Sequence, residues 1–413
     1  MPKLAHLAPP PALGSYEDGY APIAQRFAEA LERREEVGGA LSVYHHGRLV
    51  VDLYGGWADF EAKRPWLRDT RAVVFSVTKG FAAMGFYLLA DRGLVDWNAP
   101  VATYWPGFAR AGKESITVGT LLSHRAGLPV IDRPLRLSEC VDPRAASKVL
   151  AAIEAQTPLW TPGSDQGYHA LSFGLYAREL FERIANESMN RYLRRELFAP
   201  LGSDVYLGTP PSEDPKMATL YPPAVGPRIS KMAAMIFLQP ECAEARITRL
   251  GFRRDSIPRR AFINPSAGLK GPEAYNEIPV RRENLAWASA TASADGIARA
   301  YLPFAGRGKH EETRYLREQT LEPAYERVGW SDRDRVLQKP LGWSYGFLKE
   351  ERHVFSPTRE SFGHAGMGGS LGWADPVHGL AVGYVMNRMD WRVRSPRCLR
   401  LCHALYDSEA LRG

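Results

Sequence analysis

The stretch Phe75-Ser76-Val77-Thr78-Lys79-Gly80 places a serine three residues before a lysine, at the start of an expected helix. Apolar residues recur after it at helical spacing, from Val77 to Leu88. On such a helix Ser76 and Lys79 project from the same side. The N-terminus of a helix also directs backbone N–H groups and a partial positive charge toward a bound group. The pattern therefore indicates a serine nucleophile with an amine beside it, although a serine that merely caps a helix gives the same spacing.

Length and composition describe a large soluble protein. The chain has 413 residues, is 45% hydrophobic and carries a net charge of +7. Its paired arginines are dispersed and do not form a basic stripe with interleaved aromatics, so we expect no nucleic-acid partner. The longest apolar run, residues 81–90, is too short to span a membrane, and the first 20 residues lack the apolar core of a secretory signal. We expect a cytoplasmic protein without a membrane partner; the oligomeric state stays open.

The four cysteines give no sign of a metal site. They form no Cys-x-x-Cys pair, and no Cys/His spacing resembles a zinc site. We therefore expect neither metal nor cofactor.

Expected strands lie at both ends of the chain, and expected helices lie between them. A helix through residues 23–31 precedes a hairpin of residues 40–44 and 49–54. A helix is also expected around residues 401–405. Further strands are expected at residues 343–348, 354–355, 369–374 and 380–386.

These elements predict an α/β (α+β) fold, in which an antiparallel sheet flanked by helices carries a helical lobe. Residues 1–79 and 286–413 would form the α/β lobe, and residues 80–285 the mainly helical lobe. Residues 205–280 hold many prolines and no long periodic segment, so loops are expected there. The active site would lie in the cleft between the lobes.

Two further segments carry candidate site residues. Tyr168 follows the turn Pro162-Gly163 just before an expected helix, where its phenol could reach a neighbouring site. His364 lies in Gly363-His364-Ala365-Gly366-Met367-Gly368-Gly369-Ser370, whose glycines would let a ligand approach the backbone of a strand.

The order of these segments resembles the serine β-lactamase and penicillin-binding superfamily. It is most similar to the class C-like branch, which includes the family VIII carboxylesterases. The resemblance covers nearly the whole chain apart from residues 205–280. The segments that carry it are residues 39–44, 75–80, 116–128, 162–170, 363–376 and 386–388.

The resemblance implies roles for individual residues. Ser76 matches the acylated serine, Lys79 the lysine of the first motif, and Tyr168 the tyrosine of Tyr-x-Asn. His364 occupies the lysine position of Lys-Thr-Gly, as His-x-Gly does in several relatives. The oxyanion hole would consist of the backbone N–H groups of Ser76 and Met367. Residues expected to contact substrate are His169, Gly366 and Trp373.

Two departures from the family pattern favour an esterase over a β-lactamase. Ala170 replaces the asparagine of Tyr-x-Asn, and His364 replaces a charged lysine with a group that is largely neutral at pH 7. Both changes weaken recognition of an anionic β-lactam or peptidoglycan carboxylate. The predicted function is hydrolysis of short-chain carboxylic esters, small-molecule substrates, through an acyl-enzyme on Ser76.

Three alternatives remain open. One is a weak β-lactamase or D,D-peptidase-like amidase, and another is an acyltransferase that uses the same acyl-enzyme. The third is a catalytically silent scaffold that keeps the fold, although the presence of Ser76, Lys79 and Tyr168 argues against it.

A second serine needs a separate interpretation. Gly368-Gly369-Ser370-Leu371-Gly372 matches Gly-x-Ser-x-Gly, the nucleophile elbow of α/β-hydrolases. That elbow requires a helix after the serine, whereas the residues that follow here indicate a strand and a turn. We therefore interpret Ser370 as structural.

Overall fold

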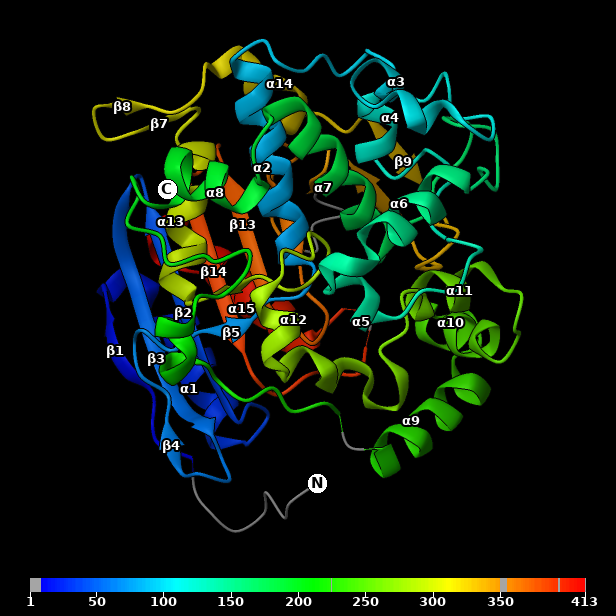
Figure 1. Cartoon of the computed structure of the whole chain (residues 1–413). Helices are drawn as coiled ribbons and strands as arrows, with labels where there is room; N and C mark the ends of the chain where they lie inside the picture. Colours follow the sequence, from blue (N-terminus) through cyan, green and yellow to red (C-terminus); the bar gives the residue numbers. More distant parts are fainter. Residues whose placement is uncertain (1–8, 224, 350–354, 393, 413) are drawn as a thin grey trace.

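A computed structural model describes residues 9–223, 225–349, 355–392 and 394–412 of the chain (Figure 1). A ten-stranded sheet forms its centre, with strand order β1-β3-β2-β14-β13-β12-β11-β10-β9 and β4 paired to β3. Every neighbouring pair in this sheet is antiparallel. The strands are β1 (Leu13–Tyr16), β2 (Gly38–His45), β3 (Arg48–Asp59), β4 (Arg64–Pro65), β9 (Gly329–Ser331), β10 (Leu341–Trp343), β11 (Leu348–Lys349), β12 (Phe362–Ala365), β13 (Leu371–Asp375) and β14 (Leu380–Met386).

Two short pairs lie outside this sheet, β5 (Ala72–Val73) with β6 (Thr291–Ala292) and β7 (Lys309–His310) with β8 (Thr313–Arg314). The first pair brings residue 73 of one chain end beside residue 291 of the other. It leads directly into the segment that holds Ser76.

Helices cover both faces of the sheet (Figure 1). On one face, α13 (Ala294–Ala305) packs against β2, β13 and β14. It approaches so closely that a Cβ added at Gly383 would lie 2.1 Å from the carbonyl oxygen of Ala294. On the other face lie α1 (Ala21–Glu32) and α15 (Pro396–Tyr406), which pack against each other. Because both faces are covered, every residue of β13 and β14 is buried.

The helix α2 (Val77–Asp91) links the sheet to the helical part of the molecule. Its residues 77–89 are all buried. It contacts β12 and β13 of the sheet as well as α7, α8 and α14. The remaining helices are α3 (Val101–Tyr104), α4 (Val118–Leu122), α5 (Leu137–Cys140), α6 (Ala146–Ala155), α7 (Ser172–Ala185), α8 (Met189–Leu193), α9 (Val225–Leu238), α10 (Ala243–Gly251), α11 (Ile257–Ile263), α12 (Ile278–Arg282) and α14 (Glu318–Tyr325).

The predicted fold class is confirmed, since strands from both chain ends form one antiparallel sheet with helices around it. Two local expectations were wrong, one for residues 343–348 and one for residues 205–280. Residues 343–348 form no single strand, because β10 ends at Trp343 and β11 begins at Leu348. Residue 354 of the expected strand at 354–355 lies outside the described residues.

The second error concerns residues 205–280, which contain the helices α9, α10 and α11 where we expected mainly loops. The expectation was wrong because we took prolines as a sign of loops. Pro258 and Pro279 instead lie in the first turns of α11 and α12. In the first turn a proline removes no helical hydrogen bond, so it starts a helix instead of breaking one.

No helix within the described ranges is long and apolar enough to cross a membrane.

Candidate active site

Ser76 lies where β5 turns into α2. Phe75, the residue before it, has a φ of 47°, in the left-handed region that non-glycine residues seldom adopt. This sharp turn places Ser76 directly before the first helical residue, Val77. Ser76 is partly exposed, whereas Lys79 is fully buried. A substrate could therefore reach the serine from solvent while the amine stays away from water.

Lys79 contacts Ser76 as the helical spacing predicted. Its Nζ lies 3.0 Å from Ser76 Oγ and donates a hydrogen bond to the carbonyl oxygen of Trp287 at 2.9 Å. No carboxylate pairs with Lys79 among the described residues. Burial lowers the pKa of Lys79 well below its usual 10.5, because the surroundings disfavour the charged amine. A neutral amine at this place has a lone pair free to accept the serine proton.

Tyr168 reaches the same oxygen from the other side. Its hydroxyl donates to Ser76 Oγ at 2.8 Å. Its ring stacks on Trp343 with centroids 5.5 Å apart and an interplanar angle of 5°. Burial raises the pKa of Tyr168 well above 10, so the phenol keeps its proton. Ser76, Lys79 and Tyr168 are thus brought together around one oxygen atom.

The backbone of Tyr168 is held by a carboxylate that the sequence did not reveal. The backbone N–H of Tyr168 lies 3.1 and 3.0 Å from the two oxygens of Asp334, which is fully buried. Asp334 also accepts from the backbone N–H groups of Val336 and Leu337. Its partner is 166 residues away, and no local pattern around Asp334 could have signalled the contact.

His364 lies on β12, against the helix that carries Ser76. Its side chain is 2% exposed, and its ring centroid lies 6.1 Å from that of Tyr168. Nδ1 donates to the carbonyl oxygen of Ala365 at 2.9 Å, so Nε2 carries a lone pair. Among the described residues Nε2 has no hydrogen-bond partner. Burial, with a smaller contribution from the nearby Lys79 amine, lowers the pKa of His364 to about 3, so the imidazole is neutral at working pH.

The loop after β12 supplies the second expected oxyanion donor. Gly366 donates its N–H to the carbonyl oxygen of Ser370 at 2.7 Å, and a Cβ at Gly366 would lie 2.0 Å from Ser370 Oγ. Within the described residues the backbone N–H groups of Ser76 and Met367 have no hydrogen-bond acceptor. These two N–H groups are therefore available to an oxyanion. Gly366 shapes the loop that carries one of them.

Ser370 is not positioned as a nucleophile. It is 1% exposed, and its Oγ donates to the carbonyl oxygen of Val74 at 2.8 Å. This bond fastens the loop to the segment immediately before Ser76. The structural interpretation of Ser370 fits its position.

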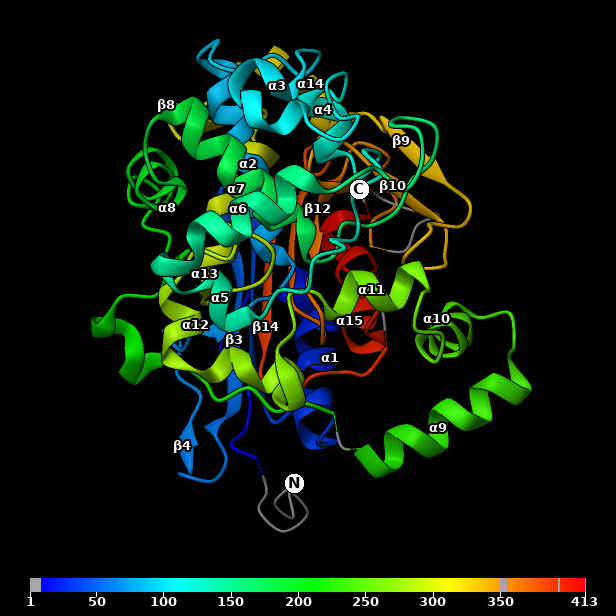
Figure 2. The same cartoon turned by 45° about the vertical axis from the view of Figure 1, so that its right-hand side comes forward.

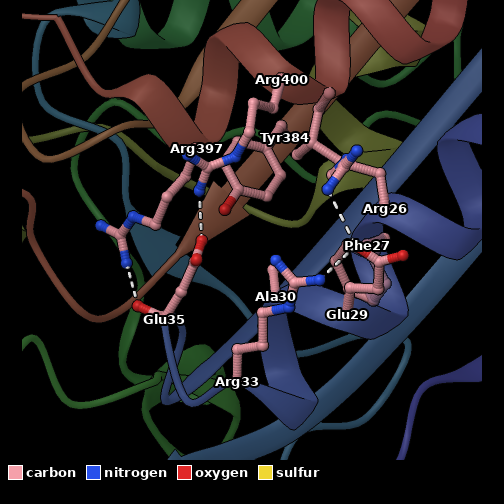
Figure 3. A pocket seen from close by; sticks show the side chains of 10 residues that line it. Arg26, Phe27, Glu29, Ala30, Arg33, Glu35, Tyr384, Arg397 and Arg400 are labelled. Carbon is pink, nitrogen blue, oxygen red and sulfur yellow. Dashed lines mark hydrogen bonds and ion pairs between the residues drawn. The ribbon is translucent and has the colours of Figure 1, made fainter.

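A buried ion cluster holds the same loop from behind. Arg397 of α15 donates to the carbonyl oxygen of Gly368 at 3.2 Å and pairs with Glu36 at 2.7 Å. Tyr384 donates its hydroxyl to Glu36 at 2.5 Å. Figure 3 shows Arg397 and Tyr384 in the pocket between α1 and α15, where Arg400 pairs with Glu35. The cluster links both chain ends to the residue that follows Met367.

Two of the expected substrate contacts lie elsewhere. Trp373 is 2% exposed and packs against Phe355 in the apolar layer under α15, whereas its neighbour Gly372 faces Val77 on the opposite side of the sheet. His169 is fully buried, donates Nδ1–H to the carbonyl oxygen of Gly167 and accepts at Nε2 from the N–H of Leu128. Trp373 therefore lies on the face of the sheet away from α2, and His169 has no ring nitrogen left for a substrate.

Among the described residues no group of three or more His, Cys, Asp or Glu side chains is placed to hold a metal ion. The chemistry available at Ser76 is thus that of a hydroxyl between an amine and a phenol, beside two free backbone N–H groups. Such an arrangement can attack a carbonyl carbon and stabilise the oxyanion that forms.

Comparison with known proteins identifies the family of the chain. The Beta-lactamase family model matches residues 23–402. The chain belongs to the Beta-lactamase family. Esterase/beta-lactamase LipL from Mycobacterium tuberculosis is 33% identical over 385 residues, which cover 91% of this chain and 83% of that protein. Esterase EstB from Burkholderia gladioli is 36% identical over 106 residues, 25% of this chain and 27% of that protein.

Solved structures show the same architecture over nearly the full length. A family VIII carboxylesterase has a TM-score of 0.81 at 31% identity and covers 96% of this chain and 99% of its own. A penicillin-binding protein homologue from Caulobacter crescentus has a TM-score of 0.82 at 31% identity, with the same coverage. The predicted membership in the superfamily is confirmed, and this Beta-lactamase family member is a hydrolase.

Proposed function

We propose that the protein is a serine carboxylesterase that hydrolyses short-chain carboxylic esters through an acyl-enzyme on Ser76. The observation that carries the proposal is the double contact at Ser76 Oγ, with the buried Lys79 amine at 3.0 Å and the Tyr168 phenol at 2.8 Å. A serine hydroxyl is a weak nucleophile until a base within hydrogen-bond reach takes its proton. Both candidates for that base are present.

Lys79 is the better base of the two. Burial disfavours the charged form of each group, which lowers the pKa of Lys79 and raises that of Tyr168. A neutral amine accepts a proton readily, whereas a phenol with a raised pKa retains its own. In the proposed reaction Lys79 takes the proton of Ser76 as the serine oxygen bonds to the ester carbonyl carbon.

Tyr168 then acts as the proton donor. When the tetrahedral intermediate collapses, the bond to the alkoxide breaks, and Tyr168 donates its hydroxyl proton to that leaving group. The Lys79 ammonium restores the phenol. Water later attacks the acyl-enzyme with the same groups in reverse order.

The backbone N–H groups of Ser76 and Met367 would stabilise the oxyanion in both steps. Each such donor lowers the activation barrier by about 3–4 kcal/mol in a water-excluding site. His364 would orient the reacting groups through its unpartnered Nε2 and would not act as the base, because its pKa of about 3 leaves it a very weak one.

The residues that surround the serine favour esters over β-lactams. Ala170 offers no amide group, and neutral His364 offers no fixed positive charge for a β-lactam carboxylate. The second candidate activity is nevertheless hydrolysis of β-lactams, because the relative LipL is named an esterase/beta-lactamase. Transfer of the acyl group to an alcohol or amine would use the same intermediate.

Initial rates on p-nitrophenyl esters of increasing acyl length, beside a chromogenic cephalosporin, test the proposal. We expect the highest kcat/KM for a short acyl chain and only slow turnover of the cephalosporin. Ser76→Ala, assayed in parallel, separates enzymatic from spontaneous hydrolysis. A kcat/KM for the cephalosporin that equals or exceeds that for p-nitrophenyl butyrate would contradict the esterase assignment.

A further inference from the structure

The helices α9, α10 and α11 form a projection at one side of the molecule, which we call the α9–α11 projection (residues 225–263). Figure 2 shows α9 extending away from the body, with α10 beside it. Contacts run from α9 to α10 and from α10 to α11. The proposed hydrolysis uses none of the residues on α9 and α10.

Large apolar side chains of this projection are exposed to solvent. Phe237 and Leu238, at the end of α9, are 82% and 80% exposed, and Phe252, just after α10, is 78% exposed. Among the described residues the only other large apolar side chain exposed to this degree is Leu269, six residues beyond α11. Exposed apolar groups gathered in one segment indicate a surface that meets an apolar partner.

The projection also carries a net positive charge. Residues 225–263 contain eight Lys and Arg against three Asp and Glu, a net charge of +5 out of the chain's +7. Arg253 and Arg254, next to Phe252, are exposed, and neither pairs with a carboxylate among the described residues. Unpaired guanidinium groups beside exposed apolar side chains are suited to phosphate groups at a lipid interface.

The base of the projection packs in the apolar cluster that also contains Tyr168. Ala261 of α11 is fully buried in the same apolar cluster as Val130 and Tyr168. Just after α11, Asn264 donates to the carbonyl oxygens of Ile131 and Arg133 and fixes the loop that follows Val130. The projection is therefore anchored through α11 to the body of the molecule, while α9 and α10 extend from it.

We propose that the α9–α11 projection docks the protein onto an anionic lipid surface. The exposed Phe237, Leu238 and Phe252 enter the boundary between headgroups and acyl chains, and the arginines bind the lipid phosphates. Charge favours this partner over a second copy of the chain, because two projections facing each other would bring like charges together. The sequence predicted no membrane partner because it contains no spanning segment, but docking at the surface requires none.

Flotation of the full-length protein with vesicles tests the proposal. Vesicles of phosphatidylcholine mixed with phosphatidylglycerol should bind the protein, and vesicles of phosphatidylcholine alone should bind it far less. Binding should weaken as salt concentration rises. The double variants Phe237→Ser/Leu238→Ser and Arg253→Glu/Arg254→Glu should each lose about tenfold or more in affinity for the anionic vesicles.

Matched controls place the same changes elsewhere on the surface. Leu67→Ser/Leu94→Ser removes two exposed leucines, and Arg33→Glu/Arg48→Glu reverses two exposed charges outside the projection. Both control variants should bind anionic vesicles like the unaltered protein. All four variants should hydrolyse a soluble p-nitrophenyl ester at the unaltered rate, which shows that they are folded.

Because the readout is binding, its outcome is independent of the proposed esterase activity. Equal vesicle binding by the projection variants and the unaltered protein would overturn the proposal. So would a protein that binds no anionic vesicles. Sedimentation equilibrium that shows a dimer dissociated by Phe237→Ser/Leu238→Ser, or binding to duplex DNA in place of vesicles, would likewise overturn it in favour of another partner.

Discussion

A lysine serves as a base only while its amine is neutral, and Lys79 lies where the charged form is disfavoured. Its pKa lies well below 10.5 because the side chain is fully buried. The rate should therefore rise with pH as Lys79 loses its proton, and the midpoint of this rise should lie well below 10.5. A pH profile of kcat/KM measures this midpoint. The rising limb should be absent from the residual activity of Lys79→Ala, and its persistence there would assign the limb to another group.

Lys79 and Tyr168 act in one proton-transfer path, so the losses in kcat caused by replacing each residue should not be additive. Lys79→Ala and Tyr168→Phe should each lower kcat by about 10²- to 10⁴-fold. The double variant should lose little more than the worse of the two, because a path broken once is already broken. Steady-state kinetics of the three variants form the test. Losses that multiply in the double variant would mean that the two residues act in separate steps.

His364 should influence the rate without titrating. Its pKa of about 3 keeps the ring neutral across the working range, so His364→Asn should change no inflection near pH 6.5. The same variant keeps a donor and an acceptor and should lower kcat/KM by about 10- to 100-fold. His364→Ala should cost more yet still allow a fluorophosphonate to label Ser76. Complete loss of labelling in a folded His364→Ala protein would make His364 the activating base.

At the scale of elements, α15 and the segment just before β2 hold the loop that contains Met367, through Arg397 and Glu36. Burial, opposed by the charge of Arg397 and the hydroxyl of Tyr384, raises the pKa of Glu36 from 4.5 to about 7. The folded protein thus keeps a proton that the unfolded chain releases near pH 4.5. This stabilisation is complete below pH 4.5 and is lost as pH rises through about 7.

Glu36→Gln removes this titration, so the difference in free energy of unfolding between the unaltered protein and the variant should depend on pH. Between pH 4.5 and 8 the unaltered protein should lose about 3 kcal/mol relative to Glu36→Gln. Urea unfolding followed by tryptophan fluorescence measures it. Glu35→Gln, which removes the neighbouring and more exposed carboxylate, is the control and should parallel the unaltered protein. A constant difference between Glu36→Gln and the unaltered protein would contradict the account.

The elements that the sequence predicted best are those with a local signal. The apolar spacing after Ser76 predicted α2, and the spacing of Ser76 and Lys79 predicted their contact. The prediction that Trp373 contacts substrate was wrong. Alternation along β13 shows that neighbouring residues face opposite sides of the sheet, but not which side faces α2. The role of Asp334 was not predicted, because its contact with Tyr168 spans 166 residues of the sequence.

At the scale of the whole molecule, the two chain ends meet around the start of α2. The pairing of Val73 with Thr291, the bond of Ser370 to Val74 and the bond of Lys79 to Trp287 all join the region around Ser76 to residues more than 200 positions away. The order of the segments predicted this architecture, since the strands lay at both ends of the chain. The α9–α11 projection was not predicted because the prolines of this segment indicated loops, whereas Pro258 lies in the first turn of α11.

The central claim is that Ser76, and not Ser370, is the nucleophile. Reaction with a fluorophosphonate followed by peptide mapping in a mass spectrometer tests it most directly. The adduct should lie on the peptide that holds Ser76, disappear in Ser76→Ala and persist in Ser370→Ala, because only Ser76 Oγ has an amine and a phenol in contact. An adduct on Ser370, or no adduct in the folded protein, would contradict the account.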